Sequence, residues 1–98
     1  MFMREIREAG SYARWFSRLR DREAKARILV RIRRLSLGNP GDCASVGDGV
    51  WEMRIHYGPG YRVYFVERGS SRVVLLGGGK KATQERDIQR ARQLAKEL

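Results

Sequence analysis

Apolar residues recur at helical spacing near the start of the chain. They stand at i, i+3, i+4 and i+7, namely Tyr12, Trp15, Phe16 and Leu19. This pattern predicts a first helix, and Ser11 in front of it is a suitable N-cap. The mixed residues 2–7 are expected to form an edge strand that leads into this helix.

A second helical stripe follows Asp21, whose carboxylate can cap the helix. The buried positions of this helix are Ala24, Ile28, Ile32 and Leu35. Gly38 and Pro40 supply its C-terminal stop. We expect the two helices to pair as a hairpin.

The apolar spacing changes from helical to alternating in the second half of the chain. Residues 38–49 are rich in turn-forming types and predict an irregular loop. Two half-buried strands are then predicted over 51–57 and 61–66, on either side of a Gly-Pro-Gly break. The core side of the first of these strands holds Trp51, Met53, Ile55 and Tyr57. The short apolar run 73–76 predicts a central strand buried on both faces.

The chain ends in a third amphipathic segment after the triple glycine at 77–79. Thr83 can cap this helix, and its buried face is expected to hold Ile88, Ala91, Ala95 and Leu98. The predicted fold is therefore α+β, with an N-terminal helical hairpin packed on an antiparallel β-sheet and a C-terminal helix, all helices lying on one side of the sheet. A chain of 98 residues supports a single domain, 1–98.

A register for the two central strands follows if residues 58–60 form a three-residue hairpin loop. Tyr57 then faces Tyr61 on the core side. On the opposite side His56 faces Arg62 and Arg54 faces Tyr64. This register predicts that four polar side chains converge on one surface.

The charge balance of the chain gives information about its binding partner. The chain carries 21 Lys and Arg against 11 Asp and Glu, a formal net charge of +10. Such an excess on a small body attracts polyanions, so nucleic acid heads the list of partners. High charge that only maintains solubility, and an acidic protein partner, remain open as alternatives.

The composition also bounds the compartment and the chemistry. Cys43 is the only cysteine, so no disulfide can form within the chain. The N-terminus has no apolar run long enough for a signal peptide or a membrane span, and we expect a cytoplasmic protein with no membrane partner. One cysteine and one histidine cannot supply a zinc site, and neither a metal nor any other cofactor is expected.

The polar surface of the central strands suits metal-free RNA cleavage. That reaction needs a group to take the proton of the ribose 2′-OH, positive donors for the phosphorane, and a proton source for the leaving oxygen. His56 can serve as base or acid, and Arg54 and Arg62 can grip phosphate oxygens. Tyr64 can stack on a base or donate a hydrogen bond. An exposed strand histidine beside a turn is the simpler alternative for His56.

Two further basic features are candidate RNA contacts. Arg27, Arg31 and Arg34 recur at i, i+4 and i+7 and form a basic ridge on the second helix. A ridge of this kind can equally be a solvated helix face. Lys80 and Lys81 precede the N-terminus of the last helix, where both their charge and the helix dipole favour phosphate.

Three stretches resemble the HigB-like addiction-module killer proteins, also described as the phage Gp49-like branch of the RelE/ParE toxins. The similarity runs from about residue 12 to the end and includes ARILVRIRRLSLGNPGD, VWEMRIHYGPGYRVYFVERG and LLGGGKKATQERDIQRARQLAKEL. Its most specific motifs are E-x-R-I-x-x-G-x-G-Y-R-V-Y-F over 52–65 and G-G-x-K-x-x-Q-x-x-D-I over 78–88. One departure is Lys80, since an acidic residue often follows the glycine pair in this family.

The resemblance implies a RelE-like fold and a ribosome-dependent endoribonuclease that cuts mRNA, an mRNA interferase. By motif, the functional positions that it carries over are Arg54, Arg62, Tyr64 and Lys81, whereas His56 is not carried over. It also implies a cognate helix-turn-helix antitoxin, with which the toxin would form a heterotetramer. Fold likeness does not fix function, because ParE relatives poison DNA gyrase. A basic nucleic-acid-binding module without activity is the third reading.

Overall fold

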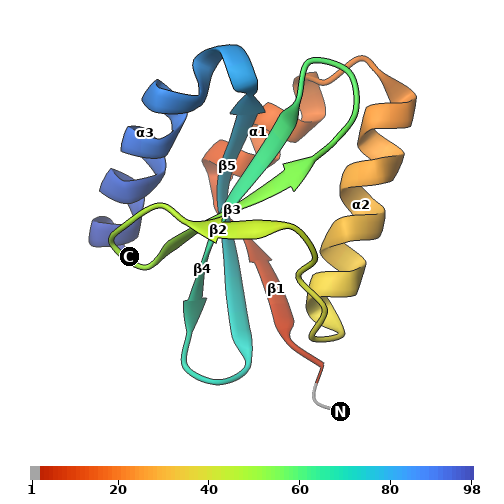
Figure 1. Cartoon of the computed structure of the whole chain (residues 1–98). Helices are drawn as coiled ribbons and strands as arrows, with labels where there is room; N and C mark the ends of the chain where they lie inside the picture. Colours follow the sequence, from red (N-terminus) through yellow and green to blue (C-terminus); the bar gives the residue numbers. More distant parts are fainter. Residues whose placement is uncertain (1–2) are drawn as a thin grey trace.

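The computed structural model describes residues 3–98 and contains one five-stranded sheet with three α-helices (Figure 1). Along the chain the elements are β1 (Glu5–Glu8), α1 (Gly10–Arg18), α2 (Arg22–Ser36), β2 (Cys43–Ser45), β3 (Val50–Ile55), β4 (Tyr61–Arg68), β5 (Arg72–Lys80), the 3-10 turn η1 (Lys81–Thr83) and α3 (Gln84–Glu97). The predicted α+β class is confirmed. None of the described helices is long and apolar enough to span a bilayer.

The sheet is mixed and not antiparallel as predicted. Its strand order is β1-β5-β4-β3-β2, and β1 runs parallel to β5 while the other neighbours are antiparallel. The edge strand predicted over 2–7 exists as β1 (Glu5–Glu8), and residue 2 of that range lies outside the described residues. β1 pairs with Arg72–Leu75, which are far from it along the chain, and no local spacing in the sequence predicts such a contact.

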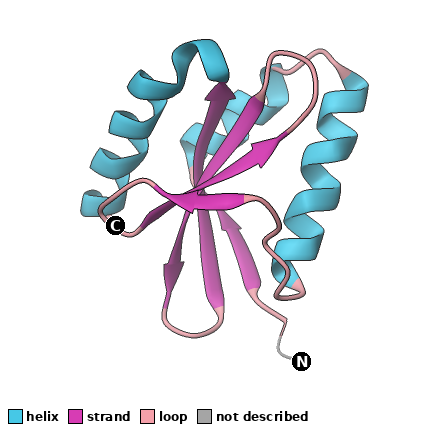
Figure 2. Cartoon of the chain, in the orientation of Figure 1, coloured by secondary structure: helices cyan, strands magenta, loops and turns pink. Residues whose placement is uncertain are grey.

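Helices cover both faces of the sheet, which corrects the expectation of a one-sided layer (Figure 2). On one face, residues of α1 and α2 pack in a core around Tyr12, Ile28 and Phe65. On the other face, Ala91 and Ala95 of α3 pack against Tyr64, Val66 and neighbouring residues. An apolar stripe shows that a helix is buried, but it does not say against which face of a sheet.

The helix boundaries follow the predicted stripes, with different caps at two of them. Asp21 caps α2 as expected, because its carboxylate accepts from the Ala24 N–H at 3.1 Å. Ser11 is not the cap of α1, which begins at Gly10, and its hydroxyl donates instead to the Leu76 carbonyl. Thr83 makes no capping bond to α3. The predicted buried position Leu98 is 61% exposed beyond the end of that helix.

The register of β3 and β4 differs from the prediction by two residues. Arg54 pairs with Arg62, and Glu52 pairs with Tyr64. The connection is longer than three residues, and it turns through Gly58 and Gly60, both at positive φ. Because the shift is even, every residue keeps its predicted side of the sheet.

Three smaller features were not predicted. The loop over 38–49 contains β2, which pairs with β3 at the sheet edge. β5 continues through the triple glycine to Lys80, with an irregularity in its pairing between Tyr64 and Phe65. Trp51, predicted to be in the core, is 37% exposed near that edge.

Candidate functional site

A fully buried carboxylate lies at the centre of the site. Glu52 of β3 has no exposed surface, and its two oxygens are shared among four side chains. Its partners, which together with it form what we call the Glu52 cluster, are Arg54, Arg62, Tyr64 and Gln84. A buried charge is stable only when paired and hydrogen-bonded, and this carboxylate has both kinds of partner.

Arg54 and Arg62 project from the same face of the sheet, as expected, because they are direct cross-strand partners. Two guanidinium groups at such a position would repel each other without a counter-charge. Glu52 supplies that charge, since Arg54 Nε lies 3.2 Å from Oε1 and Arg62 Nε lies 3.4 Å from Oε2. The cluster therefore holds two cations together with one buried anion, and the exposed Asp42 carboxylate adds a second anion 3.8 Å from Arg54 Nη1.

Arg62 is the more constrained of the two arginines. Its side chain is 11% exposed, against 39% for Arg54. One terminal nitrogen donates to the Gly60 carbonyl at 2.8 Å, which fixes the end of the side chain against the turn. The buried Nε–H is within ion-pair distance of Glu52 but has no hydrogen-bond partner of good geometry among the described residues. Arg62 is thus held in a fixed position, with its unpaired Nε–H buried against Glu52.

Tyr64 lies below the surface on which it was expected to meet RNA, and of its two expected interactions the structure has the hydrogen bond. Its ring is 1% exposed, and its hydroxyl donates to Glu52 Oε2 at 3.0 Å. Burial and the neighbouring carboxylate raise the pKa of this phenol well above its usual value, so the phenol stays protonated as a donor. A ring in this position does not stack on a base, and Tyr64 instead orients Glu52.

Gln84 brings the start of α3 into the cluster through a 2.9 Å bond from its amide to Glu52 Oε2. The helix sits close to β5 because Gly79 leaves room for Asp87, whose carboxylate oxygen would lie 1.9 Å from a Cβ at that glycine. Thr83 donates to the same carboxylate at 2.5 Å. The sequence analysis assigned no role to Glu52 or Gln84, although each is a specified residue of one of the two family motifs.

His56 does not join the cluster, which corrects the predicted convergence. It lies beyond the end of β3 with a 76% exposed side chain, and its Nε2 is 2.5 Å from Asp42 Oδ2. The hydrogen bond from His56 lowers the pKa of the Asp42 carboxyl, and the charge of Arg54 adds to this effect. The two-residue shift in register accounts for the error, because it places Arg54 opposite Arg62.

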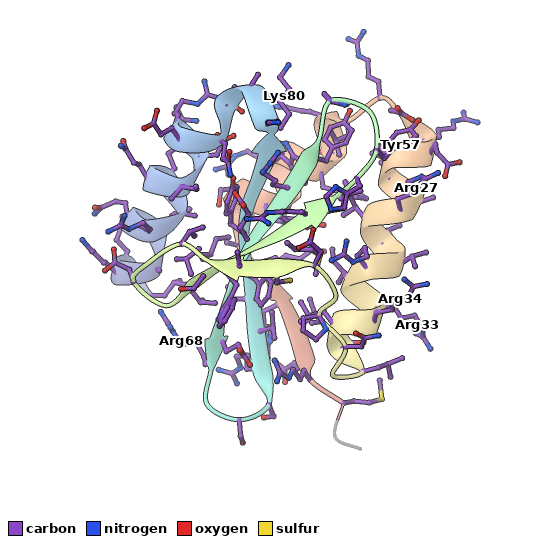
Figure 3. The ribbon with its side chains drawn as sticks, viewed as in Figure 1. Arg27, Arg33, Arg34, Tyr57, Arg68 and Lys80 are labelled. Atoms are coloured by element: carbon purple, nitrogen blue, oxygen red, sulfur yellow. The ribbon has the colours of Figure 1, made fainter. Side chains whose placement is uncertain are left out.

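The arginines of the predicted basic ridge on α2 have different partners. Arg31 donates to the backbone carbonyls of Arg54, Pro40 and Asp42, and so ties the helix to the adjoining loop. Arg27 pairs with Glu23 and lies 4.6 Å from the ring centroid of Tyr57. Arg34 is exposed on the same helix (Figure 3). All three arginines nevertheless line one open cavity of about 400 Å³ together with His56. Their role as RNA contacts stays a prediction.

Lys80 and Lys81 are both exposed where β5 passes into η1, and Figure 3 labels Lys80 at this end of β5. Lys81 lies beside the Glu52 cluster. A Cβ placed on Gly60 would be 3.3 Å from both Arg62 Nη1 and Lys81 Cβ. Arg54, Arg62 and Lys81 thus offer positive charge at one end of the sheet.

Residues 14–96 match the family described as Phage derived protein Gp49-like (DUF891). The chain belongs to the Gp49-like family. This family is part of the RelE/HigB-like toxin group. A relative from Haemophilus influenzae (strain ATCC 51907 / DSM 11121 / KW20 / Rd), described as an uncharacterized protein, is 47% identical over 94 residues, which cover 96% of this chain and 95% of the relative.

Proposed function

We propose that this Gp49-like protein is the toxin of a type II toxin–antitoxin system, and that it inhibits translation by cutting mRNA on the ribosome without a metal ion. Membership of a toxin group is consistent with the first part. The observation that supports the second part is the pairing of Arg54 with Arg62 on one face, held by the buried Glu52. The proposed site is the rim formed by these arginines and Lys81.

The proposed reaction is an internal phosphoryl transfer. The ribose 2′-oxygen attacks the adjacent phosphorus as its proton leaves, and the bond from phosphorus to the 5′-oxygen breaks as that oxygen gains a proton. The products are a 2′,3′-cyclic phosphate and a 5′-hydroxyl. Negative charge grows on the non-bridging oxygens, where fixed guanidinium and ammonium groups stabilise the phosphorane. Arg62 suits this task best because its position is already fixed by Gly60 and Glu52.

The proposed partner is a helix-turn-helix antitoxin encoded beside the toxin, and the complex would be a heterotetramer. A net charge of +10 favours acidic segments on that partner. The antitoxin would silence the toxin by covering the rim of Arg54, Arg62 and Lys81. The helix-turn-helix antitoxin and the heterotetramer are both part of the proposed function.

Inducible expression with and without the neighbouring gene tests the function. We expect growth arrest and truncated transcripts from the toxin alone, and rescue by its neighbour. Arg62→Ala should abolish both effects, whereas Arg33→Ala, which removes an exposed charge on α2, should retain them. Circular dichroism checks that each variant is folded.

Two outcomes would overturn the nuclease. DNA-damage signalling with intact transcripts would favour a gyrase poison. Folded protein that binds nucleic acid without cleavage or growth arrest would favour a passive binding module.

A further inference from the structure

A basic cavity lies next to the Glu52 cluster, between α1 and α3. It has a volume of about 330 Å³, and its floor is formed by Leu76, Gly77 and Gly78 of β5. β1 pairs only with residues Arg72–Leu75 of β5, so in the described chain the second half of β5 has no strand on that side. The cavity occupies this part of the sheet edge, where α1 and α3 flank β5 (Figure 1).

Four arginines line the cavity, two from each helix at i, i+4 spacing: Arg14, Arg18, Arg86 and Arg90. Residues at this spacing lie on the same face of a helix, so each pair faces the cavity together. Arg86 Nε is 3.5 Å from Asp87, whose carboxylate also accepts from Thr83. The other three arginines have no acidic partner among the described residues, which leaves a concentrated positive charge.

The glycines of β5 keep the cavity open. A Cβ on Gly77 would meet nothing within 4 Å, so the space above it is free of protein atoms. A Cβ on Gly78 would lie 2.4 Å from the Trp15 ring, which shows that this indole rests directly on the strand and forms a wall of the cavity. Trp15 packs with the α1 side of the sheet and reaches the rim of the cavity, where an indole beside guanidinium groups is suited to a nucleobase joined to phosphates.

We propose that this cavity binds one nucleotide of the single-stranded RNA, beside the phosphate that is cut. The inference rests on the proposed function for its substrate. Tyr64 connects the two sites, because it lines the cavity while its hydroxyl bonds to Glu52. The guanidinium groups hold the neighbouring phosphates, and Trp15 packs against the base.

The size of the cavity favours a nucleotide over a protein partner. A volume of about 330 Å³ is at the lower end of small-ligand pockets, which span about 300–1,000 Å³. A partner helix with its side chains is about 10–12 Å across and needs a longer groove. A single nucleotide in an RNA strand is the smaller unit and brings negative charge to the three arginines that have no acidic partner among the described residues.

The test uses a short single-stranded 2′-O-methyl RNA, which lacks the attacking hydroxyl and stays intact. Trp51→Phe leaves Trp15 as the only tryptophan, so its fluorescence reports on the cavity. We expect saturable quenching by the RNA. The double variant Arg14→Ala/Arg90→Ala should weaken binding about tenfold for each arginine and reduce the slope of log affinity against log salt by about 1.4.

Two variants serve as controls for charge and for shape. Arg20→Ala/Arg33→Ala removes the same charge from exposed positions away from the cavity and should leave the binding nearly unchanged. Gly77→Met keeps all four arginines but places a side chain in the open space, and it should also weaken binding. Equal weakening by both arginine pairs, full binding by Gly77→Met, or no quenching in the parent protein would overturn the inference.

Cleavage and binding separate this inference from the proposed function. RNA bound through the cavity by a protein that leaves transcripts intact refutes the nuclease and supports the cavity. Active cleavage with unchanged binding in Arg14→Ala/Arg90→Ala supports the nuclease and overturns the cavity.

Discussion

Tyr64 and Glu52 face each other across β4 and β3, and the tyrosine hydroxyl donates to the carboxylate at 3.0 Å. Both side chains are almost completely buried. The contact places an anion beneath two arginines and leaves no solvent access to either partner. The chemistry of the surface therefore depends on a polar network below it.

Glu52→Gln should destabilise the protein by about 3 kcal/mol, because a buried guanidinium loses its counter-charge. The new amide also turns one acceptor into a donor that faces other donors. Urea unfolding measures the change, and we expect cleavage to fall as well. Glu85→Gln, at an exposed position of α3, is the matched control. Wild-type stability in Glu52→Gln would show that the carboxylate does not organise the arginines.

Tyr64→Phe should cost only about 1 kcal/mol, because Glu52 keeps its bonds from Arg54 and Gln84. Growth arrest and transcript cleavage should persist, since the hydroxyl points at Glu52 and away from the surface. Loss of cleavage in a folded Tyr64→Phe protein would instead make the phenol a group that reacts with RNA. Unfolding curves and transcript ends measured on the same variant decide between the two roles.

The sequence predicted the helices well because each shows a single apolar stripe, and it located the start of α2 because Asp21 caps that helix. It also assigned Arg54 and Arg62 to one face, since alternation alone determines the side of a strand. The register could not be predicted, because a shift of two residues preserves that alternation. The burial of Glu52 escaped notice for a related reason. Glu52 is a polar residue on the side of the strand opposite its apolar residues, so the alternation predicts that it is exposed. In the structure α3 covers that face of the sheet.

Gly60→Ala should reduce cleavage because the new methyl group would displace the side chains of Arg62 and Lys81. Gly60 has φ of +78°, and a new Cβ would lie 3.3 Å from both Arg62 Nη1 and Lys81 Cβ. Gly69→Ala is a close control, because its φ is +67° and nothing lies within 4 Å of its Cβ position. Both variants should lose about 1 kcal/mol from backbone strain. Only Gly60→Ala should also lose activity, and equal activity in the two variants would remove Arg62 and Lys81 from the site.

Asp21→Asn should make the protein less sensitive to acid. The backbone N–H of Ala24 lowers the pKa of Asp21 in the folded state, and the hydroxyl of Tyr57 adds to this effect. A lowered folded-state pKa stabilises the protein above the ordinary value of 3.8, and that stability is lost as pH falls through the lower folded pKa. The wild type should therefore be more stable than Asp21→Asn near neutrality.

The gap between the two proteins should close as pH falls below the folded-state pKa of Asp21, where the wild-type carboxyl is protonated in both states. Asparagine still caps a helix, so the comparison isolates the charge of Asp21 from the cap itself. Urea unfolding of both proteins across this range measures the difference. The difference in unfolding free energy between the two proteins could instead stay constant from neutral to acidic pH. That result would show that the hydrogen bonds from the Ala24 N–H and the Tyr57 hydroxyl do not favour the ionised form of Asp21.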